Sequence, residues 1–320
     1  MLKTFLATLS PMLVMLICIV IGFVLKKAKI APDNTDKVLS KLETCVCVPA
    51  LILSTFINYC TVASLKQNYN IILYSLLALA ISVVMSIPLS IFFEKHDKYK
   101  QNIYRYGMAF ANSGFMGNAI VPAILGSIDS EILYKYLLFT LPINTAIYTW
   151  GMILLIPKRS GEKQENPLKR LVNPTCFAMA VGITLGLLGV KEIMPDFLGT
   201  AISYCKDCMG PLAMILTGFV VGGYSAKNML INKKVYLATF LRLFLLPAII
   251  LTVIKLAGAP DSILKLALFA YATPLGLNTI VFPAAYGGET ETGAAMAMVS
   301  HTLCVVSIPI MYALLTKILA

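Results

Sequence analysis

Charged side chains are scarce in this sequence: they make up 13% of its 320 residues, whereas 58% are hydrophobic. Soluble domains carry about a quarter charged residues, so a soluble protein is excluded. The net charge of +11 comes mostly from short loops between apolar segments, where membrane topology explains it without a nucleic-acid partner. The composition therefore predicts an integral membrane protein that lies in a lipid bilayer and does not bind nucleic acid.

Histidine and clustered acidic residues are scarce as well. The chain has two histidines, and one of them, His96, lies in a charged loop. Its eight cysteines show no spacing typical of a metal site, because Cys45 and Cys47 are too close and the Cys205–Cys208 pair lies inside an apolar segment. We therefore expect free thiols, no metal, no cofactor and no enzyme activity.

Long hydrophobic runs, by contrast, fill the sequence. Each of ten apolar segments is long enough to cross a hydrocarbon core of roughly 30 Å. The segments are 5–25, 38–58, 69–93, 103–126, 132–156, 171–190, 197–224, 235–256, 263–287 and 292–319. The first is followed by lysines instead of a small-residue cleavage site, so we expect it to be a permanent span.

The loops between these segments alternate between rich and poor in basic residues. Lys and Arg accumulate in cytoplasmic loops, so the rich loops define the cytoplasmic side of the cell membrane. They contain Lys26, Lys27, Lys29, Lys37 and Lys41; Lys95, Lys98, Lys100 and Arg105; Lys158, Arg159, Lys163, Lys169 and Arg170; and Lys227, Lys233 and Lys234. This pattern predicts a multi-pass protein with both termini outside.

Two stretches of the chain, 110–126 and 271–287, resemble each other half a chain length apart. Their alignment pairs Pro122 with Pro283, Ala111 with Ala272, Ala123 with Ala284 and Gly126 with Gly287. A second pair, 49–56 and 211–219, recurs at nearly the same offset. A polar cytoplasmic loop, 158–170, separates the halves 1–157 and 171–320. Because each half has five spans, the second half enters from the opposite face, which predicts an inverted repeat.

Both stretches 110–126 and 271–287 contain asparagine, glycine and proline, which a continuous membrane helix avoids. Such residues are tolerated at membrane depth where freed backbone groups face protein or a wet cavity, so we predict two broken helices. Backbone groups freed near a proline, amide side chains and the first N–H groups of a restarted helix suit an anion such as a carboxylate. Helix packing is the alternative, since small residues also let helices approach closely. The candidate binding residues are Asn112, Ser113, Gly114, Gly117, Asn118, Pro122, Thr273, Pro274, Gly276, Asn278, Thr279 and Pro283, with Asn144 in the fifth span beside them.

Several motifs resemble the auxin efflux carrier family of bacteria and plants. They are NSGFMGNAIVP (112–122), VPALILSTF (48–56), Asn144 with Trp150-Gly151, Arg242 with Pro247, and Ser307-Ile-Pro309. The resemblance covers essentially the whole chain, and the absence of a long cytoplasmic loop indicates the bacterial type. It implies an all-α integral membrane protein of ten transmembrane helices in two inverted five-helix repeats, with helices 4 and 9 broken and crossing at their prolines.

The same resemblance implies a division of labour between helices. Helices 1, 2, 6 and 7 would form a scaffold, through which the protein forms a homodimer. Helices 3–5 and 8–10 would form a transport domain that moves like an elevator. The implied function is a secondary transporter or facilitator that exports a small organic anion, a carboxylate such as malate, malonate or an auxin-like acid, with the substrate gradient, membrane potential or protons as driving force.

Two other functions remain open at this point. One is a sodium-coupled symporter of the related bile-acid type, although neither broken segment has a carboxylate before its proline to bind sodium. The other is a solute-sensing membrane receptor, although the chain shows no effector domain.

Few ionisable residues lie within the predicted spans. Asp207 is a candidate proton carrier, and it should not pair with Lys206 because adjacent helical residues point in different directions. Arg242 either attracts the anion or extends to the cytoplasmic interface. His301 either couples transport to protons or is a hydrogen-bonded packing residue. We expect Glu43 to be a solvated residue near the cytoplasmic end of its span.

Overall fold

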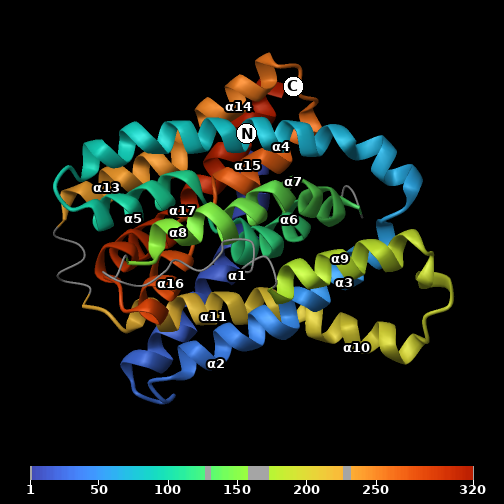
Figure 1. The fold of residues 1–320 in the computed structure, drawn as a ribbon, viewed down its shortest axis with the longest axis horizontal. Coiled ribbons are helices and arrows are strands. Elements are labelled where there is room, and N and C mark those ends of the chain that lie inside the picture. The colour runs from blue at the N-terminus through green and yellow to red at the C-terminus, as the bar shows by residue number, and fades with distance from the viewer. Residues whose placement is uncertain (1, 127–130, 158–172, 226–231, 320) are drawn as a thin grey trace.

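The computed structural model describes residues 2–126, 131–157, 173–225 and 232–319, whose regular elements are all helical (Figure 1). In the first half these are α1 (Leu2–Lys27), α2 (Thr35–Leu42), η1 (Glu43–Cys47), α3 (Val48–Tyr59), α4 (Val62–Phe93), α5 (Lys98–Ala109), η2 (Ser113–Gly117), α6 (Asn118–Leu125), α7 (Ile132–Ala146), η3 (Ile147–Gly151) and α8 (Met152–Leu155). In the second half they are α9 (Pro174–Leu187), η5 (Val190–Glu192), α10 (Asp196–Asp207), α11 (Met209–Gly222), α13 (Lys233–Phe240), η6 (Leu241–Leu245), α14 (Leu246–Leu256), α15 (Asp261–Tyr271), α16 (Asn278–Tyr286) and α17 (Glu291–Leu319). The predicted loop 158–170 lies outside the described residues.

Within the described residues, seven helical stretches are long and apolar enough to cross a membrane. They are Leu2–Lys27, Thr35–Tyr59, Val62–Phe93, Ile132–Leu155, Asp196–Gly222, Lys233–Leu256 and Glu291–Leu319. Each coincides with one of the ten predicted segments. The other three segments contain the short helix α9 and two interrupted pairs, α5 with α6 and α15 with α16. The chain is therefore a multi-pass membrane protein.

Three of the long stretches contain a π-helical turn, namely η1, η3 and η6. A π turn inserts an extra residue into the helix and often marks a functional site. Two of these turns carry a buried charged side chain: Glu43 lies on η1 and Arg242 on η6. These two turns thus place ionisable side chains in the interior of the protein.

Helices α1 and α11 pack closely against each other. The Cα hydrogen of Gly218 faces the backbone of Ile19, and that of Gly22 faces the backbone of Ile215, so neither position has room for a side-chain carbon. Small residues at such a crossing let two membrane helices approach closely enough for extensive van der Waals packing. Figure 1 shows α11 with α2, α3, α9 and α10 in the lower half of the view and α4, α5, α13, α14 and α15 in the upper half.

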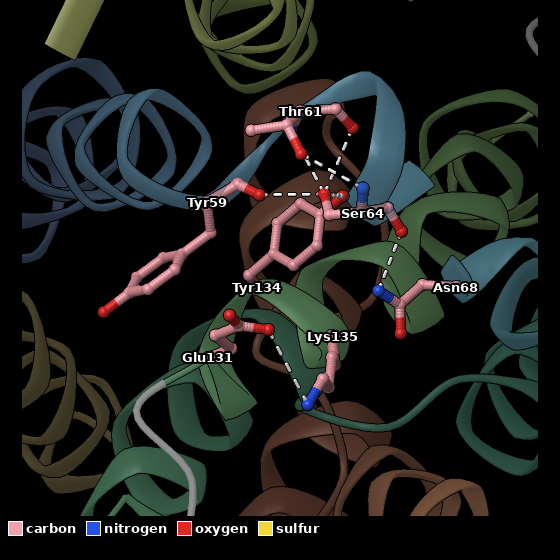
Figure 2. A network of polar contacts seen from close by, with 7 residues as sticks. All are labelled: Tyr59, Thr61, Ser64, Asn68, Glu131, Tyr134 and Lys135. Atoms are coloured by element: carbon pink, nitrogen blue, oxygen red, sulfur yellow. Dashed lines mark hydrogen bonds and ion pairs between the residues drawn. The ribbon is translucent and has the colours of Figure 1, made fainter. Parts of the chain in front are cut away.

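A polar network fastens the start of α4 to α7 (Figure 2). The Thr61 hydroxyl accepts a hydrogen bond from the Ser64 amide (3.0 Å), and the Ser64 hydroxyl accepts one from the Thr61 amide (3.1 Å), which forms a capping box. The Ser64 hydroxyl also donates to the Tyr59 carbonyl (2.8 Å) and lies 2.9 Å from the Tyr134 hydroxyl of α7. This arrangement fixes where α3 ends and α4 begins, at the face of the molecule opposite the basic loops.

Candidate functional site

The two predicted interruptions are present, and they contact each other. Helix α5 ends at Ala109, and Phe110 is extended, with φ −121° and ψ 136°. The second interruption covers residues 272–277 between α15 and α16. Ala111 and Leu275 form an antiparallel bridge, and the backbone N–H of Asn112 donates a hydrogen bond to the Pro274 carbonyl at 2.8 Å. Each break therefore satisfies backbone groups of the other, which is how irregular backbone is tolerated at membrane depth.

The prediction that the broken helices cross at Pro122 and Pro283 is wrong. Both prolines lie inside helices, α6 and α16 respectively. The helical backbone continues through both of them, from Ser113 to Leu125 and from Asn278 to Tyr286, so neither proline marks a break. The second break instead contains Pro274, which disfavours helix at the residue before it. The first break, at residues 110–112, contains no proline.

Six of the predicted binding residues line one small cavity where the breaks meet. They are Asn112, Gly114, Asn118, Asn144, Gly276 and Asn278. The facing wall comes from other helices and includes Thr44 of η1 and Thr175 of α9, with Tyr148 of η3 beside them. The cavity measures about 40 Å³, which is room for a few water molecules at about 10–15 Å³ each. An organic anion would therefore have to widen it.

The other predicted residues support the breaks without lining this cavity. The Thr279 hydroxyl donates to the Gly276 carbonyl (2.9 Å), and the Ser113 carbonyl accepts from the Tyr136 hydroxyl (3.0 Å). The hydroxyls of Ser113 and Thr273 are buried and have no hydrogen-bond partner among the described residues. Gly117 packs directly against the Tyr136 ring. Pro122 lines a different hollow, on the face opposite the basic loops.

Two of the cavity asparagines are held by side chains that the sequence did not single out for this role. The Asn278 Nδ2 donates to the Tyr106 hydroxyl of α5 at 3.0 Å. The Asn112 Nδ2 lies 3.2 Å from the His301 Nε2 of α17. Next to His301, the Ser300 hydroxyl accepts a hydrogen bond from the Leu275 amide at 3.1 Å. Tyr106 and Ser300 carry no sequence signal beyond being polar residues in apolar segments.

Wider hollows adjoin the cavity on both of its faces. Towards the basic loops, a hollow of about 330 Å³ shares Thr44, Tyr148 and Asn278 with the cavity, and it adjoins another of about 860 Å³ through Ser40 and Val281. The larger one is lined by Lys26, Lys37 and Lys41. On the opposite face, a hollow of about 560 Å³ shares Asn118 with the cavity. The cavity is thus the smallest of a series of adjoining hollows that lie between the two faces of the protein.

Ion pairs lie at both ends of this series. Lys26 contacts Asp33 at 2.7 Å, and the hydrogen bond and charge of Lys26 lower the pKa of Asp33. On the opposite face, Lys206 lies 3.8 Å from Asp207, and both line the hollow there. The prediction that these two residues do not pair is wrong, because both side chains are partly exposed and the long Lys206 side chain can bend to reach its neighbour.

The buried charges also differ from expectation. Glu43 is fully buried, and neither of its carboxylate oxygens has a hydrogen-bond partner among the described residues, so the prediction of a solvated residue is wrong. Its place on the π turn η1, packed against α9, α10 and α11, removes it from water. Arg242 is 1% exposed and does not reach an interface, and none of the hollows described above includes it in its lining.

Two glycines of η2, which follows the first break, allow a matched test of this geometry. A methyl group at Gly117 would collide with the Tyr136 side chain, whereas one at Gly114 would meet nothing within 4 Å. We expect Gly117→Ala to lower the stability of the protein by about 1–3 kcal/mol, as overpacking does, and Gly114→Ala to leave it nearly unchanged. Thermal unfolding of the two purified variants in the same detergent measures the difference, and equal midpoints would contradict the described packing.

Crossed helix breaks within a multi-pass bundle, with polar groups at the crossing and hollows on both faces, define a membrane transport protein. Comparison with known proteins gives the same class, because residues 7–312 match the family described as membrane transport protein. The chain therefore belongs to this family, that of the auxin efflux carriers which its motifs resemble.

Similar proteins include two transporters of unassigned substrate. One, an uncharacterized transporter of Methanothermobacter thermautotrophicus, is 22% identical over 220 residues, which is 68% of this chain and 69% of that protein. The other, the uncharacterized transporter YfdV of Escherichia coli, is 24% identical over 202 residues, which is 62% of each chain. The second match thus covers less than two thirds of its relative's length.

Proposed function

We propose that this protein is a secondary transporter or facilitator that exports a small organic anion, with the crossing of the two breaks as its binding site. The observation that carries the proposal is the cavity between the breaks, where the side chains of Asn112, Asn118, Asn144 and Asn278 converge between hollows on the two faces. Amide groups can both donate and accept hydrogen bonds, which suits binding and release without chemical conversion.

An anion is favoured over other solutes by the groups around the cavity. Helical backbone restarts beside it at Ser113 and again at Asn278, and the first amides of a helix together with its dipole attract negative charge. The hollow towards the basic loops is lined by three lysines and one aspartate. None of the described residues that line the central cavity is a carboxylate, which supports transport without sodium.

The arrangement of helices supports a sliding mechanism. One wall of the cavity comes from the α2–η1–α3 stretch and α9, which belong to predicted helices 2 and 6, and the breaks belong to predicted helices 4 and 9. We infer that helices 1, 2, 6 and 7 form a stationary scaffold and that helices 3–5 and 8–10 carry the anion past it like an elevator. In this proposal ten helices form two inverted repeats, both termini lie outside the cell membrane, and the scaffold mediates a homodimer.

Flux through liposomes that contain the purified protein tests this function. We expect uptake of labelled malate or indole acetate by the wild type. The rate should fall at least about tenfold in Asn112→Ala and in Asn278→Ala, because each substitution removes hydrogen bonds to a charged ligand, worth about 1.5–3 kcal/mol. Asn68→Ala is the matched control, since the Asn68 Nδ2 donates to the Ser64 carbonyl at the start of α4, and Asn68 does not line the central cavity. A sodium gradient should have no effect.

Two results would contradict the proposal. Binding of these acids without flux would identify a receptor instead of a carrier. Full transport by both asparagine variants would place the site away from the crossing.

A further inference from the structure

Both ring nitrogens of His301 are engaged, and the two contacts together define the state of the ring. Nδ1 lies 2.8 Å from the Ala297 carbonyl oxygen, which can only accept, so Nδ1 carries the hydrogen. In the neutral ring Nε2 then has no hydrogen and accepts one from the Asn112 Nδ2 at 3.2 Å. His301 is 2% exposed, so water does not compete for these contacts.

This arrangement determines what Asn112 presents to the cavity. With the His301 ring neutral, one N–H of the Asn112 amide is committed to Nε2, and the amide oxygen is free to face a ligand. A carboxylate only accepts hydrogen bonds, so an amide oxygen is the wrong partner for it. If the ring gains a proton, Nε2 becomes a donor, and the favourable arrangement is a rotated amide whose oxygen accepts from Nε2. Both N–H groups of Asn112 are then free for the anion.

We propose that His301 is a positioning residue that takes up one proton when the organic anion binds and thereby turns the Asn112 amide from acceptor to donor. This proposal rests on the proposed function and adds to it a coupling of one proton to each anion. The proton comes from water and is bound at Nε2, and it returns to water when the anion leaves. By linkage, the proton strengthens anion binding as much as the anion strengthens proton binding.

The surroundings of His301 favour joint binding over protonation alone. The elements packed against α17 are α1, α5, α11, α13, α15, α16 and η6. Among the described residues, these elements and α17 itself bury the following titratable side chains: Tyr104, Tyr106, Arg242, Tyr271, Cys304 and Tyr312. Their partly buried titratable residues are Cys18, Lys26, Tyr99, Lys100, Arg105 and Lys265. The exposed ones are Lys3, Lys27, Lys98, Lys233, Lys234, Tyr236, Tyr286 and Lys317. Among the described residues, the carboxylates of these elements are Asp261 and Glu291, which are exposed first residues of α15 and α17. No carboxylate of these elements is thus buried to balance a charged ring, and the charge of Arg242 opposes it, so the bound anion supplies the compensating charge.

The state of the ring can be measured without any ligand, because the chain has two histidines. Nitrogen NMR of protein with labelled histidine should show the His301 ring as the Nδ1–H form, with its signals assigned by their loss in His301→Gln. The Nε2 signal should shift in Asn112→Ala, which removes the donor to it. The opposite tautomer, or an Nε2 chemical shift that is the same in the wild type and Asn112→Ala, would overturn the proposal whether or not a ligand binds.

Proton uptake on binding tests the coupling itself. Calorimetric titration with malate and with indole acetate, in two buffers that differ in ionisation enthalpy, counts the protons taken up for each anion bound. For the wild type between pH 6 and 8 we expect one proton per anion and an apparent Kd that falls by up to about tenfold for each unit of decreasing pH. His301→Gln can still hydrogen-bond Asn112 but does not titrate, so its Kd should be independent of pH and its uptake zero.

Controls separate this proposal from the proposed function. Ser307→Ala alters another buried polar residue of α17 and should keep the wild-type proton uptake. Anion binding by the wild type without proton uptake, or equal uptake in wild type and His301→Gln, would overturn the role of His301 and leave the transporter intact. Failure of the wild type to bind or carry either anion would instead contradict the proposed function, and the tautomer measurement would still decide the contact between His301 and Asn112. If His301→Gln does not fold, His301→Asn replaces it in the titration.

Discussion

Replacing Gly218 by valine is expected to prevent the protein from folding or to reduce its stability by more than about 3 kcal/mol, the upper range for overpacking. A Cβ at this position would overlap the Ile19 backbone of α1, and a carbonyl group cannot move aside without separating the two helices. Because Gly22 faces the Ile215 backbone in the same way, separation at one glycine also opens the contact at the other. The yield of monodisperse protein in detergent and its unfolding midpoint measure this effect.

The matched control is Gly199→Val in α10. There a Cβ would meet only the end of the Met194 side chain, at 3.4 Å, so the same change in helix propensity occurs without a backbone collision. We expect this variant to behave nearly like the wild type. A similar loss of folded protein in both variants would mean that the helix propensity of valine, and not the contact between α1 and α11, accounts for the result.

Replacing Arg242 by methionine is expected to increase stability while it impairs transport. The guanidinium group is buried, and its three nitrogens have neither a hydrogen bond nor an ion pair among the described residues. Burying a charge costs several kcal/mol, and apolar replacements of similar volume stabilise buried ionic sites by about 1–4 kcal/mol. The buried charge of Arg242 therefore lowers the stability of the folded protein. Its turn, η6, packs against α5 and α17, the helices whose Tyr106 and His301 contact Asn278 and Asn112.

The expected loss of transport follows from the charge itself. As a general scale, a positive charge attracts an anion about 10 Å away by roughly 1.7 kcal/mol at an effective dielectric constant of about 20, which is more than tenfold in affinity. Anion flux and the unfolding midpoint should therefore change in opposite directions in Arg242→Met. Arg242→Lys keeps the charge and should retain most of the flux. A fall in both quantities for Arg242→Met would indicate that the arginine stabilises the fold instead.

The sequence predicted the membrane spans well because a span is a local property. Hydrophobic length alone located the seven long helical stretches, including those that begin at Leu2 and end at Leu319. The sequence also located the interrupted stretches, since asparagine, glycine and proline oppose a continuous helix wherever they occur. It misplaced the breaks, however, because the helices continue through Pro122 and Pro283, and the breaks lie at residues 110–112 and 272–277, where the two segments contact each other.

The candidate site was predictable only in part, because it depends on which helix faces meet. Six of the proposed residues converge because each belongs to, or lies beside, a break. His301 was a candidate for another reason, and its contact with Asn112 joins residues far apart in the chain that no local pattern relates. Glu43 was misjudged because distance along a helix does not reveal what packs around it. Thr44, Tyr148 and Thr175 are ordinary residues of their helices and become part of the cavity wall only through tertiary packing.

The hydrogen bonds that hold the two asparagines have a consequence for how a cargo would travel. Tyr106 and His301 belong to the same set of helices as the breaks, whereas Thr44 and Thr175 on the facing wall do not. If these helices move as one rigid body, as proposed above, the hydrogen bonds that position the two asparagines are kept during the movement. The bound anion would then not have to dissociate and rebind partway. Only the contacts of the anion with the facing wall, which includes Thr44 and Thr175, would change during the movement.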